Sequence, residues 1–144
     1  MGPRAAPDRG SRLSTYVLDS TVLIAYLRDI PPMASVLQRL LADGHTLGTT
    51  CVNLAEIERG LRPRERKRTQ SLLDRLRFLE TDREGARRAG SYQAEWAKRG
   101  RTILTPDALV AGTARAHGAV VLTHNTVDFP MVDLRVVHPD EIDV

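Results

Sequence analysis

Acidic side chains recur in this sequence where short apolar stretches end and where helices begin. Asp19 follows one apolar stretch, and Asp107 falls in the first turn of a predicted helix. Glu56 lies on another predicted helix, and Asn125 and Asp128 follow a later apolar stretch. If one sheet edge gathers these carboxylates, their like charges repel, and a hard cation such as Mg²⁺ relieves that repulsion. Because a metal ion can activate water for attack on phosphorus, the pattern indicates metal-dependent phosphodiester hydrolysis.

The residues before Asp107 predict where its helix starts. Thr105 is suited to the N-cap, and Pro106 to the first helical position, where its missing N–H costs no hydrogen bond. Taken alone, a first-turn acid is explained by its favourable interaction with the helix dipole. Asp107 is favoured as a metal ligand only when the other acids are considered with it. Behind the acid, the helix presents a face of small residues that permits close packing, formed by Ala108, Ala111 and Ala114.

The other acids also have plain structural explanations. Asp19 can cap the buried helix predicted over residues 22–27. Glu56 can be a solvated residue of the helix predicted over 51–61, where it shares a face with Asn53. Histidine chemistry is not indicated, because the spacing of the four histidines is not that of metal ligands. We expect all of them to be ordinary surface or hydrogen-bonded residues: His45, His117, His124 and His138.

Strands and helices alternate along the chain, which predicts an α/β fold with a mainly parallel sheet. Short apolar or Thr-rich stretches predict strands over residues 16–18, 46–49, 119–122 and 134–137. Helical periodicity predicts helices over 22–27, 35–42, 51–61, 72–79, 83–99 and 105–116. In this arrangement each acidic segment lies at a strand end or a helix start, which is where ligands collect in open α/β sheets.

The composition indicates one globular domain. The chain has 144 residues, 42% hydrophobic and 27% charged, and can bury a substantial core. We expect residues 15–144 to form this domain and residues 1–14 to be a mobile tail, because the first stretch contains Gly, Pro and charges without periodicity. The single Cys51 excludes an internal disulfide and a cysteine-based zinc site. No stretch is typical of a membrane span or a signal peptide, so we expect a cytoplasmic protein.

A modest excess of positive charge permits a phosphate-rich partner. The net charge is +3, and nearly all of the positive charge is arginine. Arginine matches the geometry of phosphate better than lysine does. Residues 59–68 contain six cations, interrupted by Pro63. This run is either a solvated turn between two helices or a rim that contacts phosphates.

Four segments together resemble, in order, the four motif blocks of PIN-domain ribonucleases. They are Val17-Leu18-Asp19-Ser20-Thr21-Val22-Leu23-Ile24, Asn53-Leu54-Ala55-Glu56-Ile57, Asp107-Ala108-Leu109-Val110-Ala111 and Thr123-His124-Asn125-Thr126-Val127-Asp128-Phe129. The resemblance covers about residues 15–140. The small size of the chain is similar to that of the VapC-type toxins of bacterial type II toxin–antitoxin pairs.

The resemblance implies a three-layer α/β/α fold with four to five short strands, and it implies roles for the acids. By that resemblance, Asp19 and Asp107 would ligate Mg²⁺ or Mn²⁺. Glu56 would complete an acidic triad and help to orient the nucleophile, and Ser20 would form a hydrogen bond within the site. Many relatives have an acid at the position of Asn125, so the fourth role falls either to Asp128 or to Asn125 as a neutral ligand.

The resemblance also implies partners. Family members form homodimers, cleave structured RNAs, often transfer RNA, and are inhibited by a cognate antitoxin whose C-terminal segment blocks the site. If RNA is the substrate, charge reversal of Arg64 and Arg66 is predicted to weaken its binding.

Other functions remain open from the residues alone. A haloacid-dehalogenase-like phosphatase also begins with an acid at a strand end, but it prefers a second acid two residues later, where this chain has Thr21. Both that class and the phospho-receiver domains need a late lysine, and none follows Lys98. A non-catalytic module that binds RNA or protein is disfavoured, because such a module has no reason to keep clustered carboxylates.

Overall fold

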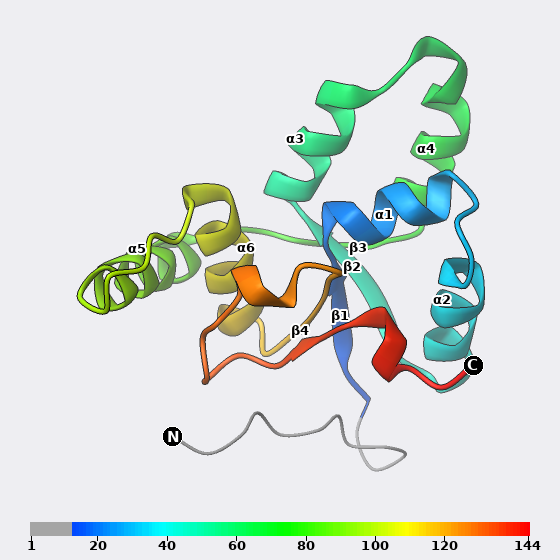
Figure 1. Cartoon of the computed structure of the whole chain (residues 1–144). Helices are drawn as coiled ribbons and strands as arrows, with labels where there is room; N and C mark the ends of the chain where they lie inside the picture. The colour runs from blue at the N-terminus through cyan, green and yellow to red at the C-terminus, as the bar shows by residue number, and fades with distance from the viewer. Residues whose placement is uncertain (1–12) are drawn as a thin grey trace.

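Five parallel strands form a central sheet between helical layers in the computed structural model, which describes residues 13–144 (Figure 1). The strands are β1 (Thr15–Leu18), β2 (Thr46–Thr50), β3 (Arg77–Leu79), β4 (Val120–Leu122) and β5 (Val136–Val137). The helices are α1 (Ser20–Leu27), α2 (Met33–Ala42), α3 (Cys51–Gly60), α4 (Arg66–Asp74), α5 (Arg83–Ala97) and α6 (Thr105–Ala116). Short 3₁₀ turns are η1 (Pro63–Glu65), η2 (Thr126–Asp128) and η3 (Pro139–Glu141). The predicted three-layer α/β fold is confirmed.

The direction of strand addition reverses between β1 and β4. The sheet order is β3-β2-β1-β4-β5, so the chain builds outward from β1 on one side and then on the other. Parallel pairing places Tyr16 beside Val120 and Leu18 beside Leu122, so β1 and β4 end side by side. In open α/β sheets, ligands bind outside the carboxyl ends of the strands at such a reversal. The residues that follow β1 and β4 are therefore well placed to form a site.

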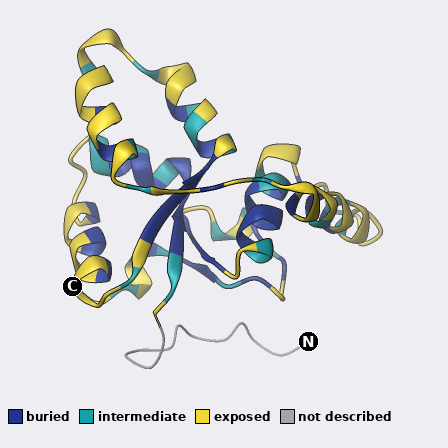
Figure 2. Cartoon of the chain, turned by 180° about the vertical axis from the view of Figure 1, so that it is seen from behind, coloured by how far each residue is buried: buried dark blue, intermediate teal, exposed yellow. Residues whose placement is uncertain are grey.

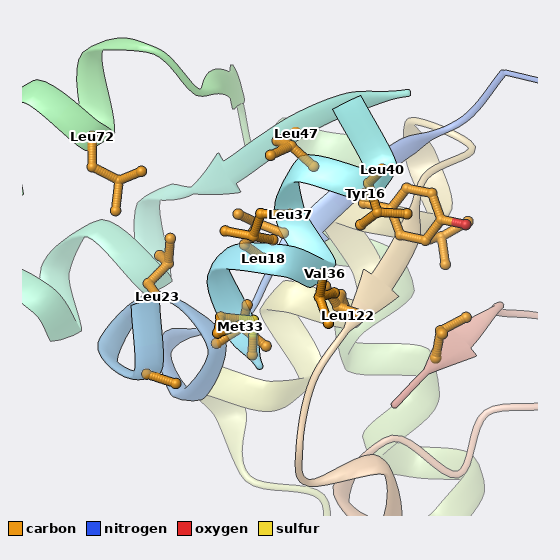
Figure 3. Packing of buried hydrophobic residues seen from close by; sticks show 14 of the residues in the cluster. Tyr16, Leu18, Leu23, Met33, Val36, Leu37, Leu40, Leu47, Leu72 and Leu122 are labelled. Carbon is orange, nitrogen blue, oxygen red and sulfur yellow. The ribbon is translucent and has the colours of Figure 1, made fainter. Parts of the chain in front are cut away.

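Alternating side chains of β1 divide the core into two clusters. Tyr16 and Leu18 belong to the cluster that includes α1 and α2, whereas Val17 belongs to the cluster that includes α5 and α6. The first cluster includes Leu18 of β1 and Leu37 of α2 (Figure 3). Because helices cover both faces of the sheet, its central strands are apolar on both sides.

Helix α5 packs against α6, and the small residues at their contact determine how closely the two helices approach. Outward faces of α5 and of the α3–α4 hairpin are exposed, whereas most residues of the central strands are buried (Figure 2). A Cβ atom on Gly112 would lie 2.3 Å from the carbonyl oxygen of Gly85 and 2.8 Å from the backbone nitrogen of Ala89. No side chain fits in that space. The predicted small-residue face of α6 is buried, as Ala108, Ala111 and Ala114.

Several predicted boundaries are wrong: the helix predicted over 72–79 already begins at Arg66, and the strand predicted over 134–137 begins at Val136. The N-cap of α6 is Leu104, and Thr105 is already helical; its hydroxyl accepts a hydrogen bond from Gln93 Nε2 at 3.0 Å instead of capping the helix. The predicted helix that included Leu79 ends at Asp74, and Leu79 belongs to the edge strand β3. Strand β3 has only three residues, too few to show the alternation of a strand. Its leucine therefore continues the helical spacing of the leucines before it, and the two elements look like one helix in the sequence.

The predicted mobile tail, residues 1–14, lies outside the described residues except at its end. The backbone N–H of Ser14 donates to His45 Nδ1 at 3.0 Å, and the carbonyl oxygen of Ser14 accepts from the backbone N–H of Thr46 at 3.0 Å. The chain is therefore attached to the start of β2 from Ser14 onward.

Candidate active site at the carboxyl edge of the sheet

The four predicted acids come from four different elements that meet at one edge of the sheet. Asp19 directly follows β1, and Asp128 lies in η2, shortly after β4. Glu56 is carried by α3, which begins at the carboxyl end of β2. Asp107 lies in the first turn of α6. Helix α6 leads into β4 and runs antiparallel to it, so the first turn of α6 lies at the carboxyl edge of the sheet. Asp107 is therefore at the same edge as the other acids.

The carboxylate of Asp19 is held by several hydrogen bonds. Its Oδ1 accepts from Asn53 Nδ2 at 3.1 Å, and its Oδ2 accepts from Thr123 Oγ1 at 2.8 Å. Only 7% of the residue is exposed. Although Asp19 occupies the N-cap of α1, its side chain makes no capping hydrogen bond, so the structural explanation for this acid is wrong. The carboxylate is fixed by residues that follow β2 and β4.

A buried Asn53 connects Asp19 with Glu56. The Nδ2 atom of Asn53 also donates to Ser20 Oγ at 3.2 Å, and Ser20 Oγ donates to Glu56 Oε1 at 2.7 Å. Thr50 Oγ1 donates to Asn53 Oδ1 at 2.8 Å and caps the start of α3. Since Asn53 is fully buried, each of its polar atoms needs such a partner. The network therefore fixes the positions of two acids through one amide.

The charges of the four acids interact. Burial, followed by the nearby negative charges of Asp128, Asp19 and Glu56, raises the pKa of Asp107 from 3.8 to about 6. Burial also raises the pKa of Asp19, with a contribution from Glu56, while the hydrogen bonds from Thr123, the Ser20 backbone and Asn53 act in the opposite direction. Strongly perturbed carboxylates that share a cleft are typical of functional sites.

The segment after β4 places Asn125 and Asp128 differently. Asn125 is exposed, and its backbone N–H donates to Thr123 Oγ1 at 3.0 Å. Asp128 is half-buried, and among neighbouring charges it is the largest influence on the pKa of Asp107. The structure thus ties Asn125 to the loop through its backbone and Asp128 to the acids through its charge.

The donor set at this edge fits a hard cation that keeps part of its water shell. Within residues 13–144, no three Asp, Glu, His or Cys side chains lie close enough together to chelate an ion directly. Mg²⁺ usually needs only one or two carboxylates and retains several waters. Asp19 and Asp107 have carboxylate oxygens of this kind, and a cation between them would relieve the repulsion that, after burial, contributes to the raised pKa of Asp107.

Two residues of this site, Asn53 and Thr123, begin motif blocks in the sequence but have no predicted role. The signal that reveals the role of Asn53 is its complete burial, which only the structure shows. Thr123 is the first polar residue after β4, a position where side chains project over the sheet edge. The histidines have structural partners, as predicted: for example, His117 Nε2 lies 2.9 Å from the carbonyl oxygen of Glu80.

The family of the chain is settled by comparison with known proteins. A family model described as "PIN domain" matches residues 16–133. The chain belongs to the PIN-domain family. This membership excludes the haloacid-dehalogenase-like phosphatase and phospho-receiver alternatives. No helix within residues 13–144 is long and apolar enough to cross a membrane.

Similar PIN-domain proteins are VapC ribonucleases. Ribonuclease VapC10 from Mycobacterium tuberculosis is 32% identical over 117 residues, which cover 81% of this chain and 87% of that protein. The tRNA(fMet)-specific endonuclease VapC from Shigella flexneri is 29% identical over 122 residues, which cover 81% and 91%. A crystal structure of VapBC2 from Rickettsia felis, bound to a DNA fragment from its promoter, superposes with a TM-score of 0.76 at 22% identity. It covers 86% of this PIN-domain chain and 98% of the matched chain, and confirms the fold.

Proposed function

We propose that this protein is a Mg²⁺-dependent endoribonuclease toxin of the VapC type. The observation that carries the proposal is the convergence of four acids at the carboxyl edge, where Asp128, Asp19 and Glu56 all raise the pKa of Asp107. Uncompensated carboxylates destabilise a fold, so their retention is explained by a cation and a phosphate substrate. The names of the relatives, among them a transfer-RNA endonuclease, support RNA as the substrate and transfer RNA as the first class to test.

Asp19 and Asp107 are proposed to hold the metal ion, which can be Mg²⁺ or Mn²⁺. When bound, the ion supplies positive charge to the reacting phosphate and lowers the pKa of the attacking water. Glu56 is proposed to orient that water, because Ser20 holds one of its oxygens at 2.7 Å. Asn53 and Thr123 are positioning residues that keep the Asp19 carboxylate in one orientation.

The fourth acidic role is proposed for Asp128 rather than Asn125. Asp128 is half-buried and acts on the charge of Asp107, whereas the exposed Asn125 is anchored to Thr123 through its backbone. A carboxylate in this position adds negative charge to the metal site. The amide of Asn125 would supply only a neutral oxygen.

A groove that begins at Glu56 is proposed to receive the cognate antitoxin. Its walls come from α1, α3 and the η1–α4 segment, and they include Ile24, Leu27, Ile57 and Glu65 besides Glu56. The matched Rickettsia felis structure is named as a VapBC complex, which supports a protein partner of this kind. An extended segment placed in the groove would reach Glu56 and thereby block the site. The homodimer remains a prediction, which sedimentation of the purified chain can test.

The proposal predicts that Asp107→Asn strongly slows RNA cleavage. The purified parent and variant are incubated with bacterial transfer RNA in Mg²⁺ or in EDTA, and the products are separated by size. Loss of a metal ligand removes several kcal/mol of transition-state stabilisation, so we expect the rate to fall on the order of 10³-fold.

Asp43→Asn is the matched control. Asp43 follows α2 and precedes β2, so it lies toward the opposite edge of the sheet, and its removal changes the net charge equally. The control should cleave like the parent. Cleavage by the parent in EDTA, or equal cleavage by Asp107→Asn, would contradict the metal-site assignment. If the parent cleaves no RNA but hydrolyses small phosphomonoesters, the proposal that this protein is a ribonuclease is wrong.

A further inference from the structure

Helix α4 and the end of α1 border a second concave surface, which we call the basic groove. Four cations line it, together with one ring, one hydroxyl and one leucine: Arg64, Lys67, Arg68, Arg75, Tyr26, Ser71 and Leu72. Its volume is about 410 Å³. Most of its lining comes from the second helix of the α3–α4 hairpin, which projects from the body of the molecule (Figure 1).

Helical spacing explains why these cations share one face. From Arg64, the positions three or four residues apart along η1 and α4 are Lys67, Arg68, Ser71 and Arg75. At 1.5 Å per residue, the row extends over about 16 Å. The groove that begins at Glu56 is bordered by a different residue of α4, Thr69. Helix α4 therefore presents different residues to the two grooves.

Ion pairing distinguishes the cations of this region. Arg66, which the sequence predicted as an RNA contact, pairs with Glu58 at 3.0 Å and is not part of the groove lining. Arg68 forms a bidentate pair with Asp29 and also donates to the carbonyl oxygen of Leu27 at 2.8 Å. These contacts fasten α4 to the end of α1 and give the groove a fixed wall.

The other three cations carry uncompensated charge. Arg64, Lys67 and Arg75 form no ion pair with any residue in the described part of the chain. The whole chain has a net charge of only +3, so three free cations in one groove are a marked concentration. A row of cations about one helical turn apart matches a partner with repeated negative charges.

We propose that the basic groove binds the phosphate backbone of the RNA substrate, away from the bond that is cut. Arginine forks and a lysine bind phosphate oxygens, and the hydroxyl of Ser71 can donate to phosphate or sugar oxygens. The groove and the Glu56 groove share α1 and α4, since Tyr26 lines one and Leu27 lines the other. One strand can therefore contact both. The inference rests on the proposed ribonuclease function and adds the surface that gives affinity for a long substrate.

The test replaces the three free cations together, as Arg64→Gln, Lys67→Gln and Arg75→Gln. Binding of bacterial transfer RNA is measured at several salt concentrations in the Asp107→Asn background, so that the RNA is not consumed. Loss of three phosphate contacts should reduce the slope of log K against log salt by about 2 to 3 and weaken binding on the order of tenfold. Arg68 is retained, because it fastens α4 to α1.

A matched control removes the same charge elsewhere. Arg83, Arg87 and Lys98 lie on or just after α5, at the other end of the molecule from α4, and are replaced by Gln (Figure 1). An equal change of slope in this control would show that net charge alone matters and would overturn the proposal. The conservative pair Arg64→Lys and Arg75→Lys should keep the slope, and circular dichroism checks that every variant folds.

Cleavage separates this inference from the proposed function. With Asp107 restored, the groove variant should cleave a short oligonucleotide spanning the cut site at the parental rate, but should have a raised KM for the full-length RNA. A parental KM on long RNA would overturn the groove proposal while leaving the ribonuclease intact. If the parent cleaves nothing, the proposed function fails, and the slope measurement still decides whether the groove binds RNA. An unchanged slope with loss of antitoxin binding would assign the groove to a protein partner and overturn the proposal.

Discussion

The acidic edge of the sheet and the arm formed by η1, α4 and Arg75 (residues 63–75) differ in how their charges are held. At the edge, Asp19 is 7% exposed and receives hydrogen bonds from residues more than 30 positions away in the chain. On the arm, Arg64, Lys67 and Arg75 are exposed and come from one short stretch. Holding like charges in fixed positions at the edge lowers the stability of the fold. The arm keeps its charges in water, where they cost little.

The contrast reflects two kinds of work. Attack on a phosphodiester requires the reacting groups in one geometry, because small displacements lower the rate steeply. Binding a phosphate backbone requires charge density more than geometry, and flexible exposed cations supply it. We therefore expect the edge to be sensitive to single substitutions that leave its charge unchanged, and the arm to respond mainly to the number of its cations.

The largest effect on stability is expected from Asn53→Ala at the edge. The change removes the hydrogen bonds to Asp19 and Ser20 and leaves the buried hydroxyl of Thr50 without its acceptor. We expect a loss of about 2 to 3 kcal/mol in the free energy of unfolding, measured by urea titration. Gln70→Ala on the arm, which removes an exposed hydrogen bond to Asp74, should change it by less than about 0.5 kcal/mol. If Asn53→Ala and Gln70→Ala lower the free energy of unfolding equally, the contrast between the edge and the arm is wrong.

A smaller effect of opposite sign is expected from Asp107→Asn. The pKa of Asp107 in the folded protein is raised from 3.8 to about 6, so the folded state binds protons more tightly than the unfolded state. The destabilisation is absent below pH 3.8, grows as the pH rises and is complete above pH 6. Without metal at pH 7.5, the variant should be more stable than the parent by about 1 kcal/mol, after allowance for solvent screening.

Thermal unfolding at several pH values checks this expectation. The two proteins should unfold at the same temperature near pH 3.5, and the variant should unfold at the higher temperature above pH 6. Adding Mg²⁺ should raise the unfolding temperature of the parent more than that of the variant, because Asp107 is a proposed ligand. A parent that is the more stable protein at pH 7.5 in EDTA would contradict the repulsion argument.

The smallest effect is expected from Arg68→Gln on the arm. Arg68 pairs with Asp29 at 2.8 Å, and both side chains are exposed, so the ion pair is screened by water and salt. Arg68 holds the pKa of Asp29 below its ordinary value. The stability difference between parent and variant should therefore be present at neutral pH and be lost as the pH falls through the pKa of Asp29. A difference that persists in 1 M salt at neutral pH would show that the bonds to backbone carbonyls dominate.

Local patterns in the sequence were sufficient for most of the elements, although not for strand β3. Alternating apolar stretches and helical periodicity predicted the α/β fold, and the order of the motif blocks predicted the PIN-domain family that the comparisons confirm. Thr105 and Pro106 predicted the start of helix α6, which carries Asp107 in its first turn, to within one residue. These features depend on neighbours along the chain, so the sequence contains them directly.

Only the tertiary structure decided which side chains hold the acids in place and which cations are free. Asn53 meets Asp19 and Ser20 because β1 and β2 are adjacent, and Thr123 meets Asp19 because β1 and β4 end side by side. Arg66 is neutralised by Glu58, whereas Lys67, one residue on, faces the basic groove. One step along a helix turns a side chain by about 100°. Burial and pairing depend on what lies in that direction, and this is determined by the packing of distant segments.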